Sequence, residues 1–269
     1  MIIEYYRPQT LQEALALLGR PEPPTKPLGG GSVLNQPSRE PLAVVDLQAL
    51  GLDGYQTKGN ILELGATLTL QGLLESLELN PGSIKPLVPG LPRAIRHEAT
   101  HNLRQMATVA GTIVAAGGSS PFTTAILALD AVLTIASAGD VASSVAETTL
   151  SIGDLLPLRR GRLEGRLITR LTLPTNAHLV YESIARSPAD LPIVCAAMAI
   201  WPSGRTRLAL GGYGKTPLLA FDGPEATGVE TAAKSAYSEA GDEWATAAYR
   251  QEMAGVLARR CLETLQKEK

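Results

Sequence analysis

The sequence is poor in residues that would build several kinds of site. Its only cysteines are Cys195 and Cys261, and neither has a second thiol nearby to begin a disulfide framework, a zinc site or an iron–sulfur site. Cys195 lies in an apolar run and Cys261 in a helical pattern, which favours small buried side chains over nucleophiles. Any iron–sulfur cluster must therefore belong to another chain.

Charge of one sign is also scarce. The chain has 24 basic and 26 acidic side chains and a formal net charge of −2, and no window gathers the Lys and Arg residues of a nucleic-acid or anionic-membrane surface. Nucleic acid is therefore not an expected partner. The one basic cluster, Arg159, Arg160, Arg162 and Arg166, lies among glycines and is interpreted as a solvated loop, with a docking surface as the alternative.

No segment predicts insertion into a membrane. The start, Met1 to Pro8, lacks the basic beginning and the continuous apolar region of a signal peptide. The stretch from Gln105 to Gly139 contains Asp130 as its sole charge, but Gly117 to Pro121 interrupts it far short of a membrane-spanning length. A cytoplasmic location without membrane insertion is expected.

Length and hydrophobic pattern predict about two α+β domains. A capping box at Thr10 to Glu13 opens the first helix, Asn80-Pro81-Gly82 predicts a turn, and Pro202-Ser203-Gly204 predicts a hairpin between the last two strands. The periodicity predicts helices at 11–18, 68–77, 91–103, 122–129, 228–239 and 242–266, and strands at 44–47, 61–65, 131–137, 167–173, 179–184, 193–201 and 205–212.

Two motifs suggest functions that their surroundings disfavour. His97-Glu98-Ala99-Thr100-His101 has the spacing of a zinc hydrolase, in which two imidazoles one helical turn apart hold the metal. The only other histidine is His178, and no further ligand pattern completes the site. Residues 209–216 fit a relaxed phosphate-binding loop, but Pro217 drives Thr216 out of the helical region. A strand that ends in a turn is the favoured interpretation there.

Two glycine-rich segments form a more informative pair: Gly29-Gly30-Gly31-Ser32, and the segment from Ala110 to Ser120. Glycines allow backbone N–H groups to converge on a pyrophosphate, and hydroxyl groups add further donors. Composition is equally consistent with two ordinary tight turns. The loops by themselves therefore do not identify a ligand.

In chain order, these segments resemble the flavin-carrying subunit of molybdenum hydroxylases of the xanthine dehydrogenase and carbon monoxide dehydrogenase type. The segment from Leu28 to Leu34 is similar to the first FAD loop of that family. The segment from Leu103 to Thr112 is similar to its second FAD loop, Ile-Arg-Asn-x-Ala-Thr-Ile-Gly-Gly-Asn. The segment from Arg207 to Gly212 resembles its C-terminal domain. The resemblance covers nearly the whole chain. It also accounts for the zinc-type motif and the phosphate-loop motif, because both lie in or beside segments that resemble the family.

The resemblance implies an α+β fold in two domains. Residues 1–173 would form a two-part FAD-binding domain of the vanillyl-alcohol-oxidase (PCMH-like) type, with subdomains of about 1–55 and 56–173. Residues 174–269 would form a small α+β domain like that of carbon monoxide dehydrogenase flavoproteins. FAD would lie between the two parts, with its pyrophosphate on both loops. The cofactor-binding residues implied are Gly29, Gly30, Gly31, Ser32, Val33, Leu34, Thr67, Ala110, Gly111 and Thr112.

The function implied is that of a flavoprotein oxidoreductase subunit without an acid–base residue or metal of its own. FAD would accept electrons from a 2Fe-2S subunit and pass them to NAD, oxygen or a quinone, in a complex with a molybdopterin-binding subunit, and the chain alone would not oxidise an organic substrate. The alternative is a degenerate member that has lost FAD and acts as a structural or assembly subunit. It is motivated by Gln105, Ala110, Thr112, Pro121 and Ser183, where the family usually has Asn, Gly, Asn, Asp and Lys.

Overall fold

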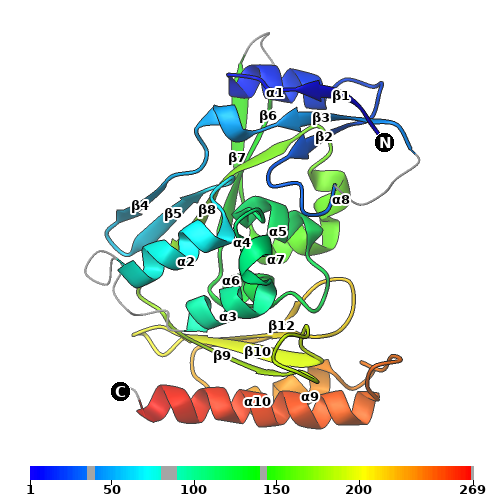
Figure 1. The fold of residues 1–269 in the computed structure, drawn as a ribbon. Coiled ribbons are helices and arrows are strands. Elements are labelled where there is room, and N and C mark those ends of the chain that lie inside the picture. Colours follow the sequence, from blue (N-terminus) through cyan, green and yellow to red (C-terminus); the bar gives the residue numbers. More distant parts are fainter. Residues whose placement is uncertain (35–39, 80–89, 140–143, 268–269) are drawn as a thin grey trace.

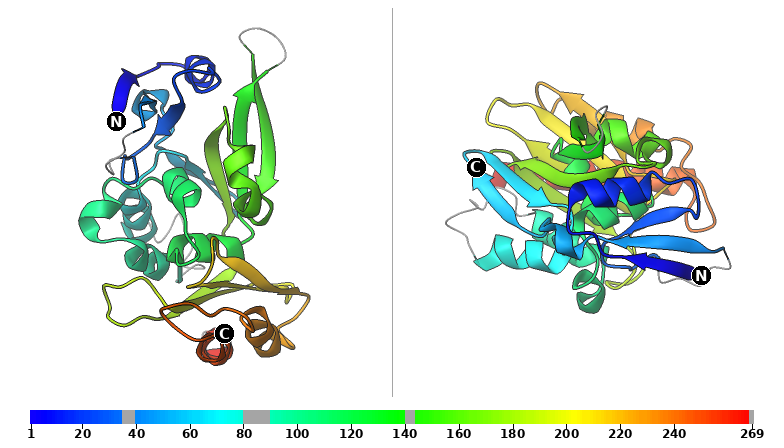
Figure 2. Two further views of the ribbon diagram at one scale, coloured as in Figure 1. Left: turned by 90° about the vertical axis from the view of Figure 1, so that its right-hand side faces the viewer. Right: turned by 90° about the horizontal axis from the view of Figure 1, so that it is seen from above.

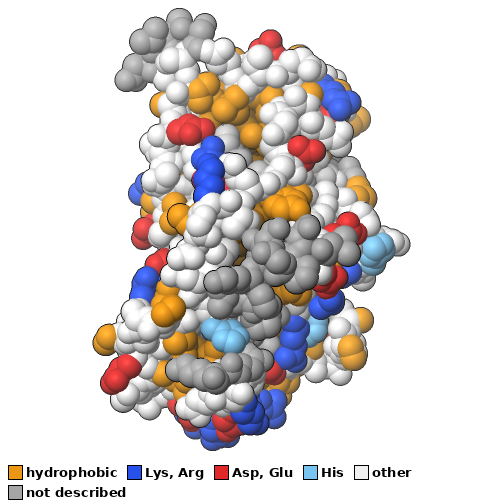
Figure 3. Space-filling model, turned by 90° about the vertical axis from the view of Figure 1, so that its left-hand side faces the viewer, with side chains coloured by type: hydrophobic (Ala, Val, Ile, Leu, Met, Phe, Trp, Pro, Cys, Tyr) orange, Lys and Arg blue, Asp and Glu red, His pale blue; other side chains and the backbone are white. Residues whose placement is uncertain are grey.

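The computed structural model describes residues 1–34, 40–79, 90–139 and 144–267. Three sheets, each with covering helices, follow one another along the long axis of the molecule (Figure 1). The turn predicted at Asn80-Pro81-Gly82 lies outside the described residues. On the face shown in Figure 3, acidic and basic side chains are intermixed, as expected from the small net charge.

The first unit is a three-stranded parallel sheet. Its strands β1 (Ile2–Tyr6), β2 (Thr25–Leu28) and β3 (Leu42–Asp46) pair in the order β1-β3-β2, at the top of Figure 1. Helix α1 (Leu11–Leu18) buries its apolar stripe in the same core as β3. Thr10 caps this helix by accepting a hydrogen bond from the N–H group of Glu13, which confirms the predicted helix start.

The second unit is a five-stranded antiparallel sheet covered by short helices. Its order is β4 (Tyr55–Lys58), β5 (Ile61–Gly65), β8 (Leu167–Pro174), β6 (Val132–Ala138) and β7 (Val145–Ser151). The other elements of this region are the 3₁₀ turns Gln48–Leu50 and Leu156–Leu158 and the helices α2 (Leu70–Leu79), α3 (Gly90–Glu98), α4 (His101–Arg104), α5 (Val109–Ala115), α6 (Pro121–Ala128), α7 (Ile152–Leu155) and α8 (Arg159–Arg162).

The third unit is a four-stranded antiparallel sheet between two layers of helix. Its order is β12 (Leu218–Gly223), β11 (Thr206–Gly211), β10 (Val194–Ile200) and β9 (His178–Ile184). Helices α9 (Val229–Ala236) and α10 (Ala247–Lys267) cover the outer face (Figures 1 and 2). Helices α3 and α6 of the second unit pack on the sheet from the other side.

Strand β10 shows how the second and third units are joined. Cys195, Ala197 and Ala199 belong to the core cluster of the second unit, whereas Ala196 and Met198 belong to the core cluster beneath α9 and α10. A strand buried on both faces has a continuous apolar sequence, which is why 193–201 lacks polar alternation. The chain leaves the second sheet at Pro174 and enters the third at His178, and the division at residue 173 stays a prediction.

The predicted helix at 91–103 is wrong in one respect. Helix α3 ends at Glu98 and α4 begins at His101, because Thr100 is extended, with φ −61° and ψ 160°. His97 and His101 therefore lie in two separate helices, so the geometry that a zinc hydrolase requires of one continuous helix is not met. Nδ1 of His97 instead lies 3.2 Å from Oγ of Ser183.

Two predicted loops are partly helical. Helix α5 includes residues 110–115 of the second glycine segment. Helix α8 includes Arg159, Arg160 and Arg162 of the basic cluster. In α8, Arg159 donates a hydrogen bond to the carbonyl oxygen of Ala116, so it is not simply solvated. The relaxed phosphate-loop motif is the end of β11, which pairs antiparallel with β10. The prediction of a strand ending in a turn is confirmed.

The strands that sequence analysis missed are short, lie at sheet edges or face solvent. Every residue of β4, for example, is exposed, so no apolar alternation marks it. The missed strands are β1, β2, β4, β7 and β12.

Candidate cofactor site

The first glycine loop leaves the carboxyl end of β2 and passes very close to residues 106–108. A Cβ atom on Gly30 would lie 1.4 Å from the carbonyl oxygen of Met106, and one on Gly29 would lie 2.8 Å from Oγ1 of Thr108. Gly31 has a φ of +71°, in the left-handed region that favours glycine. The triple glycine is thus required by this close approach and by the turn that follows it.

The backbone amides of this loop are available to a ligand. Within the described part of the chain, no hydrogen-bond acceptor is recorded for the N–H groups of Gly29, Gly30, Gly31 and Ser32. Successive N–H groups in a tight turn can converge on an anion. The loop therefore has the donors that a phosphate group requires.

The leading amides of the second glycine segment, those of residues 110–112, bond within the protein instead. Thr108 caps α5, and its Oγ1 and two carbonyl oxygens from the β5–α2 connection accept the first N–H groups of this helix. These bonds are Val109 N to Leu68 O, 2.8 Å, Ala110 N to Ala66 O, 3.1 Å, and Gly111 N to Thr108 Oγ1, 3.1 Å. The expected second set of pyrophosphate donors is therefore already committed to other partners, although Gly111 still keeps the space beside Thr108 open.

The two glycine segments nevertheless meet at one side chain. A Cβ atom on Gly111 would lie 2.7 Å from Oγ1 of Thr108, the same atom that closely approaches Gly29. Thr108 is buried and fills the space between the two backbones. The sequence resemblance therefore identified two segments that the structure brings together, but it missed the threonine between them.

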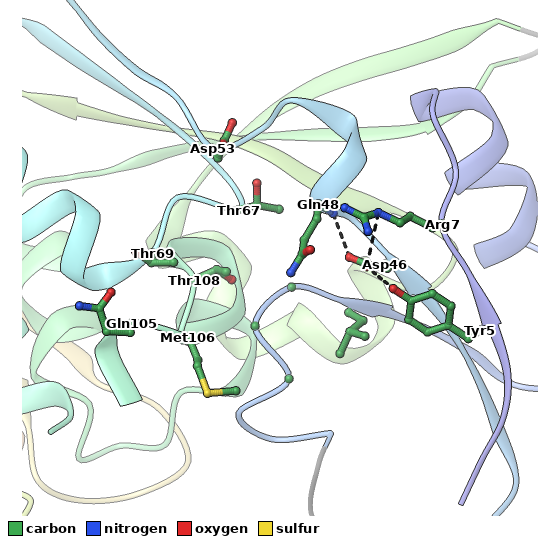
Figure 4. Close-up of a pocket in the computed structure, with 14 residues that line it drawn as sticks. Tyr5, Arg7, Asp46, Gln48, Asp53, Thr67, Thr69, Gln105, Met106 and Thr108 are labelled. Carbon is green, nitrogen blue, oxygen red and sulfur yellow. Dashed lines mark hydrogen bonds and ion pairs between the residues drawn. The ribbon is translucent and has the colours of Figure 1, made fainter. Parts of the chain in front are cut away.

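A cavity of about 690 Å³ opens beside the first loop (Figure 4). Asp46 lies at the carboxyl end of the parallel strand β3, an edge at which ligands commonly bind. Its carboxylate accepts hydrogen bonds from the hydroxyl group of Tyr5 and from the N–H group of Gln48, and Nε of Arg7 lies 3.9 Å away. The full lining is Tyr5, Arg7, Leu28, Gly29, Gly30, Gly31, Asp46, Gln48, Asp53, Thr67, Thr69, Gln105, Met106 and Thr108.

A second cavity, of about 300 Å³, opens beside the next residues of the same loop. Its walls are formed mainly by small or apolar side chains, including that of Leu191 from the third unit. Glu98 is its only ionisable lining residue within the part of the chain that the structure describes. The full lining is Ser32, Val33, Glu98, Ala99, Leu103, Ala107, Gly111, Thr112, Ala115, Ala116, Gly117, Ser119, Ser120 and Leu191.

Eight of the ten implied cofactor-binding residues line these two cavities. Gly29, Gly30, Gly31 and Thr67 line the larger cavity, and Ser32, Val33, Gly111 and Thr112 line the smaller one. Ala110 and Leu34 are in neither lining, and Ala110 packs against the core of the second unit.

Sequence analysis missed Asp46 and Glu98 as site residues. Asp46 could be found from the sequence, because a carboxylate at the end of a buried strand indicates a binding residue. The pattern around Glu98 indicates only a zinc-type motif. Two cavities joined by a loop whose amides have no acceptor in the described part of the chain suit an elongated ligand with a central anionic group. A dinucleotide cofactor has this shape. The loop fits it because Gly29 and Gly30 lack the Cβ atoms that would fill the space beside the backbone.

Comparisons with known proteins agree with this geometry. A family model described as the FAD binding domain in molybdopterin dehydrogenase matches residues 1–176. The uncharacterized protein YgfM of Escherichia coli K12 is 29% identical over 263 residues, which cover 96% of this chain and 94% of that protein. The carbon monoxide dehydrogenase medium chain of Afipia carboxidovorans is 27% identical and covers 97% of this chain and 95% of its own length.

Solved structures show the same fold. A crystal structure of Cu,Mo-CO dehydrogenase superposes with a TM-score of 0.79 and 23% identity over 98% of this chain and 97% of that chain. Quinoline 2-oxidoreductase from Pseudomonas putida 86 superposes with a TM-score of 0.75 and 22% identity over 97% and 95% of the two chains.

The chain belongs to the family of FAD-binding domains of molybdopterin dehydrogenases. The sequence resemblance, the α+β fold and FAD as the cofactor are confirmed. Relatives with assigned activities include the medium chains of two dehydrogenases and a xanthine dehydrogenase, so the protein is an oxidoreductase component. None of the helices built by the described residues has both the length and the apolar character needed to cross a bilayer.

Proposed function

We propose that FAD lies across the first glycine loop, with its pyrophosphate over the amides of Gly30, Gly31 and Ser32 and its two ends in the two cavities. The observation that carries this proposal is the position of residues 29–33. They line both cavities in succession, and among the described residues no acceptor bonds to their N–H groups. A ligand held there must be long enough to occupy both cavities at once.

The residues of the chain then bind and orient the cofactor. Gly30 permits the close approach of the loop to residues 106–108, Thr108 separates the two glycine segments, and Thr67 offers a hydroxyl group in the larger cavity. Bound FAD supplies the redox chemistry, and the protein supplies its position and electrostatic surroundings. No acid–base residue is assigned.

Fragment binding tests the two-cavity placement. The purified protein is freed of flavin and titrated with FAD, FMN and ADP, with flavin fluorescence and competition as readouts. FAD should bind at least 100-fold more tightly than either fragment, because linking two binding groups makes the second contact intramolecular. Equal affinity for FAD and FMN would overturn the proposed placement.

The further role we propose is electron relay within a complex. FAD on this chain would accept electrons from a 2Fe-2S subunit, in company with a molybdopterin-binding subunit, and pass them to NAD, oxygen or a quinone. Three findings support this role. Relatives are medium chains of carbon monoxide and glyceraldehyde dehydrogenases. Both thiols of the chain are buried, and the described residues contain no group of three or more metal-ligating side chains.

The surface near the cavities supports docking of the 2Fe-2S subunit there. Four apolar side chains of the cavity walls are about half exposed, namely Val33, Leu103, Met106 and Leu191. Large apolar side chains gathered around a site are typical of surfaces that another protein covers. A partner seated there would place its redox centre close to the flavin.

Reconstitution tests the relay. The chain is co-purified with the 2Fe-2S and molybdopterin subunits encoded in the same genome, and flavin bleaching is followed after the substrate of the complex is added. Bleaching only when the 2Fe-2S subunit is present is the expected result. A complex that assembles and oxidises its substrate while the flavin stays oxidised would contradict the relay.

A cytoplasmic location stays a prediction.

The alternative of a degenerate subunit rests partly on Ala110. Ala110 has helical backbone geometry within α5, and its N–H group bonds to Ala66. An alanine in this position therefore fits without strain and removes no donor from the ligand. The structure gives this substitution no reason to weaken FAD binding.

A further inference from the structure

Glu98 occupies an unusual position at the end of α3. Its Oε2 atom accepts a hydrogen bond from the N–H group of Phe122, at 2.8 Å, and lies 2.8 Å from Oγ of Ser120. Both partners belong to the start of α6, so Oε2 caps that helix. No hydrogen bond among the described residues uses Oε1, and the side chain lines the smaller cavity.

Among the residues that the structure describes, no counter-charge pairs with Glu98. No ion pair among the described residues includes this carboxylate. The titratable groups that face it are Tyr181 on β9 and Cys195 on β10, with His97 next to it on α3. Burial raises the pKa of the Cys195 thiol to about 12 and raises the pKa of Tyr181 as well, so both are uncharged at neutral pH.

Capping alone does not account for both oxygens. The cap requires one acceptor oxygen, which Oε2 provides, whereas Oε1 is left without a protein donor. Oε1 is not among the buried oxygen atoms that lack a partner in the described part of the chain, so water can bond to it in the ligand-free protein, and a ligand that displaces this water loses affinity unless it supplies a donor of its own. A ligand in the smaller cavity can satisfy it only with a hydrogen-bond donor, because an anionic phosphate group would be repelled.

We propose that Oε1 of Glu98 accepts a hydrogen bond from a hydroxyl group of bound FAD and so positions that part of the cofactor in the smaller cavity. This inference rests on the proposed placement of FAD across the first loop. The carboxylate also repels the pyrophosphate and so favours its position over the free amides of Gly30 to Ser32. FAD carries hydroxyl groups on the ribityl chain of its flavin half and on the ribose of its adenosine half, and the two halves share this donor chemistry.

Isosteric replacement separates the two roles of Glu98. In Glu98→Gln, the amide oxygen can still accept from Phe122 and cap α6, but an NH₂ group replaces the acceptor that faces the cavity. FAD affinity should fall about tenfold, as expected when a hydrogen bond to a charged acceptor is replaced by one between neutral groups. The melting temperature should not fall, because the cap of α6 is kept. Glu98→Ala should lower both the affinity and the melting temperature.

The matched control is Glu243→Gln, which changes an exposed glutamate outside both cavity linings and should leave FAD binding unchanged. Titrations with FMN and ADP then identify the source of the hydroxyl group. If Glu98→Gln weakens FMN, the ribityl chain is the donor, and if it weakens ADP, the ribose is the donor. A shift of the visible absorption bands of bound flavin in the variant would accompany the first result.

A ligand-side measurement keeps the inference testable if the variants fold poorly. The wild-type protein is titrated with FMN and ADP analogues that each lack one hydroxyl group. At least one analogue should bind about tenfold more weakly than its parent. If the wild type binds FAD but neither Glu98→Gln nor any deoxy analogue binds more weakly, the role of Glu98 is wrong and the placement of FAD stands. If the wild type fails to bind FAD more tightly than its fragments, the placement itself fails.

Discussion

The two glycine segments look alike in sequence but differ in what their backbones offer. The first leaves the amides of Gly29 to Ser32 without acceptors among the described residues. The second begins a helix whose leading amides bond to Leu68, Ala66 and Thr108. Glycine content alone therefore does not identify an anion-binding loop. Such a loop binds an anion only if the rest of the fold leaves its N–H groups free.

The largest expected effect comes from Gly30→Ala in the first loop. The new Cβ atom would lie 1.4 Å from the carbonyl oxygen of Met106, so the loop must move away from residues 106–108. Overpacking of this kind costs about 1–3 kcal/mol, and we expect a loss of FAD affinity of at least 100-fold. Fluorescence titration measures the affinity.

The control is Gly54→Ala, because a Cβ atom on Gly54 would meet nothing within 4 Å. This variant should bind FAD like the wild type. Wild-type affinity in Gly30→Ala would show that the first loop is not the cradle.

The next effect comes from Thr108→Val, which removes the oxygen that caps α5 and changes the contact between the two segments. Loss of a threonine cap costs about 1 kcal/mol. Thr10→Val is the matched control, because it removes the cap of α1 at a residue that lines neither cavity. Both variants should lose similar unfolding free energy in denaturant titrations. Only Thr108→Val should also weaken FAD, and equal FAD affinities would contradict a role for Thr108 at the site.

A smaller effect is expected for Ala110→Gly, which restores the usual family residue to the second segment. Glycine inside a helix costs up to about 1 kcal/mol relative to alanine. FAD affinity should not improve, because the N–H group of residue 110 is bonded to Ala66 in either case. Ala16→Gly in α1 is the control for stability. A marked gain in affinity would show that Ala110 had impaired a second set of donors.

The smallest effect is a pH dependence in the flavin-free protein. Burial raises the pKa of Glu98 above its ordinary value of 4.5, so the folded state binds this proton more tightly than the unfolded state. The contribution of Glu98 to stability is therefore fully present below pH 4.5 and is lost as pH rises through the folded pKa.

Glu98→Gln lacks this titration. As pH rises through the folded pKa of Glu98, the free energy of unfolding of the variant should therefore increase relative to that of the wild type. Unfolding curves at several pH values measure the difference, and Glu243→Gln should show no such trend. A stability difference independent of pH would contradict the assigned direction. The carboxylate of Asp222, whose pKa Arg205 lowers, contributes in the opposite sense in both proteins and cancels from the difference.

Local sequence signals predicted much of the fold. Thr10 and the stripe ending at Leu18 specified α1, the turn at Pro202-Ser203-Gly204 joined β10 and β11, and the apolar run around Cys195 marked a buried strand. Each of these depends on neighbours within a few residues. The strands missed were those, such as β4, whose side chains face solvent and whose position depends on pairing with another strand.

The family, the cofactor and the glycines of the first loop can be identified without a structure, because collinear motifs and residues without a Cβ are properties of the chain alone. Which amides keep their N–H groups available depends on the tertiary structure. The acceptors that occupy the second segment come from residues 66 and 68, about forty positions earlier. The tertiary structure also decided that Glu98 reaches the start of α6, 24 residues onward. A hydrogen bond between distant residues forms only when the packing of the core brings donor and acceptor together.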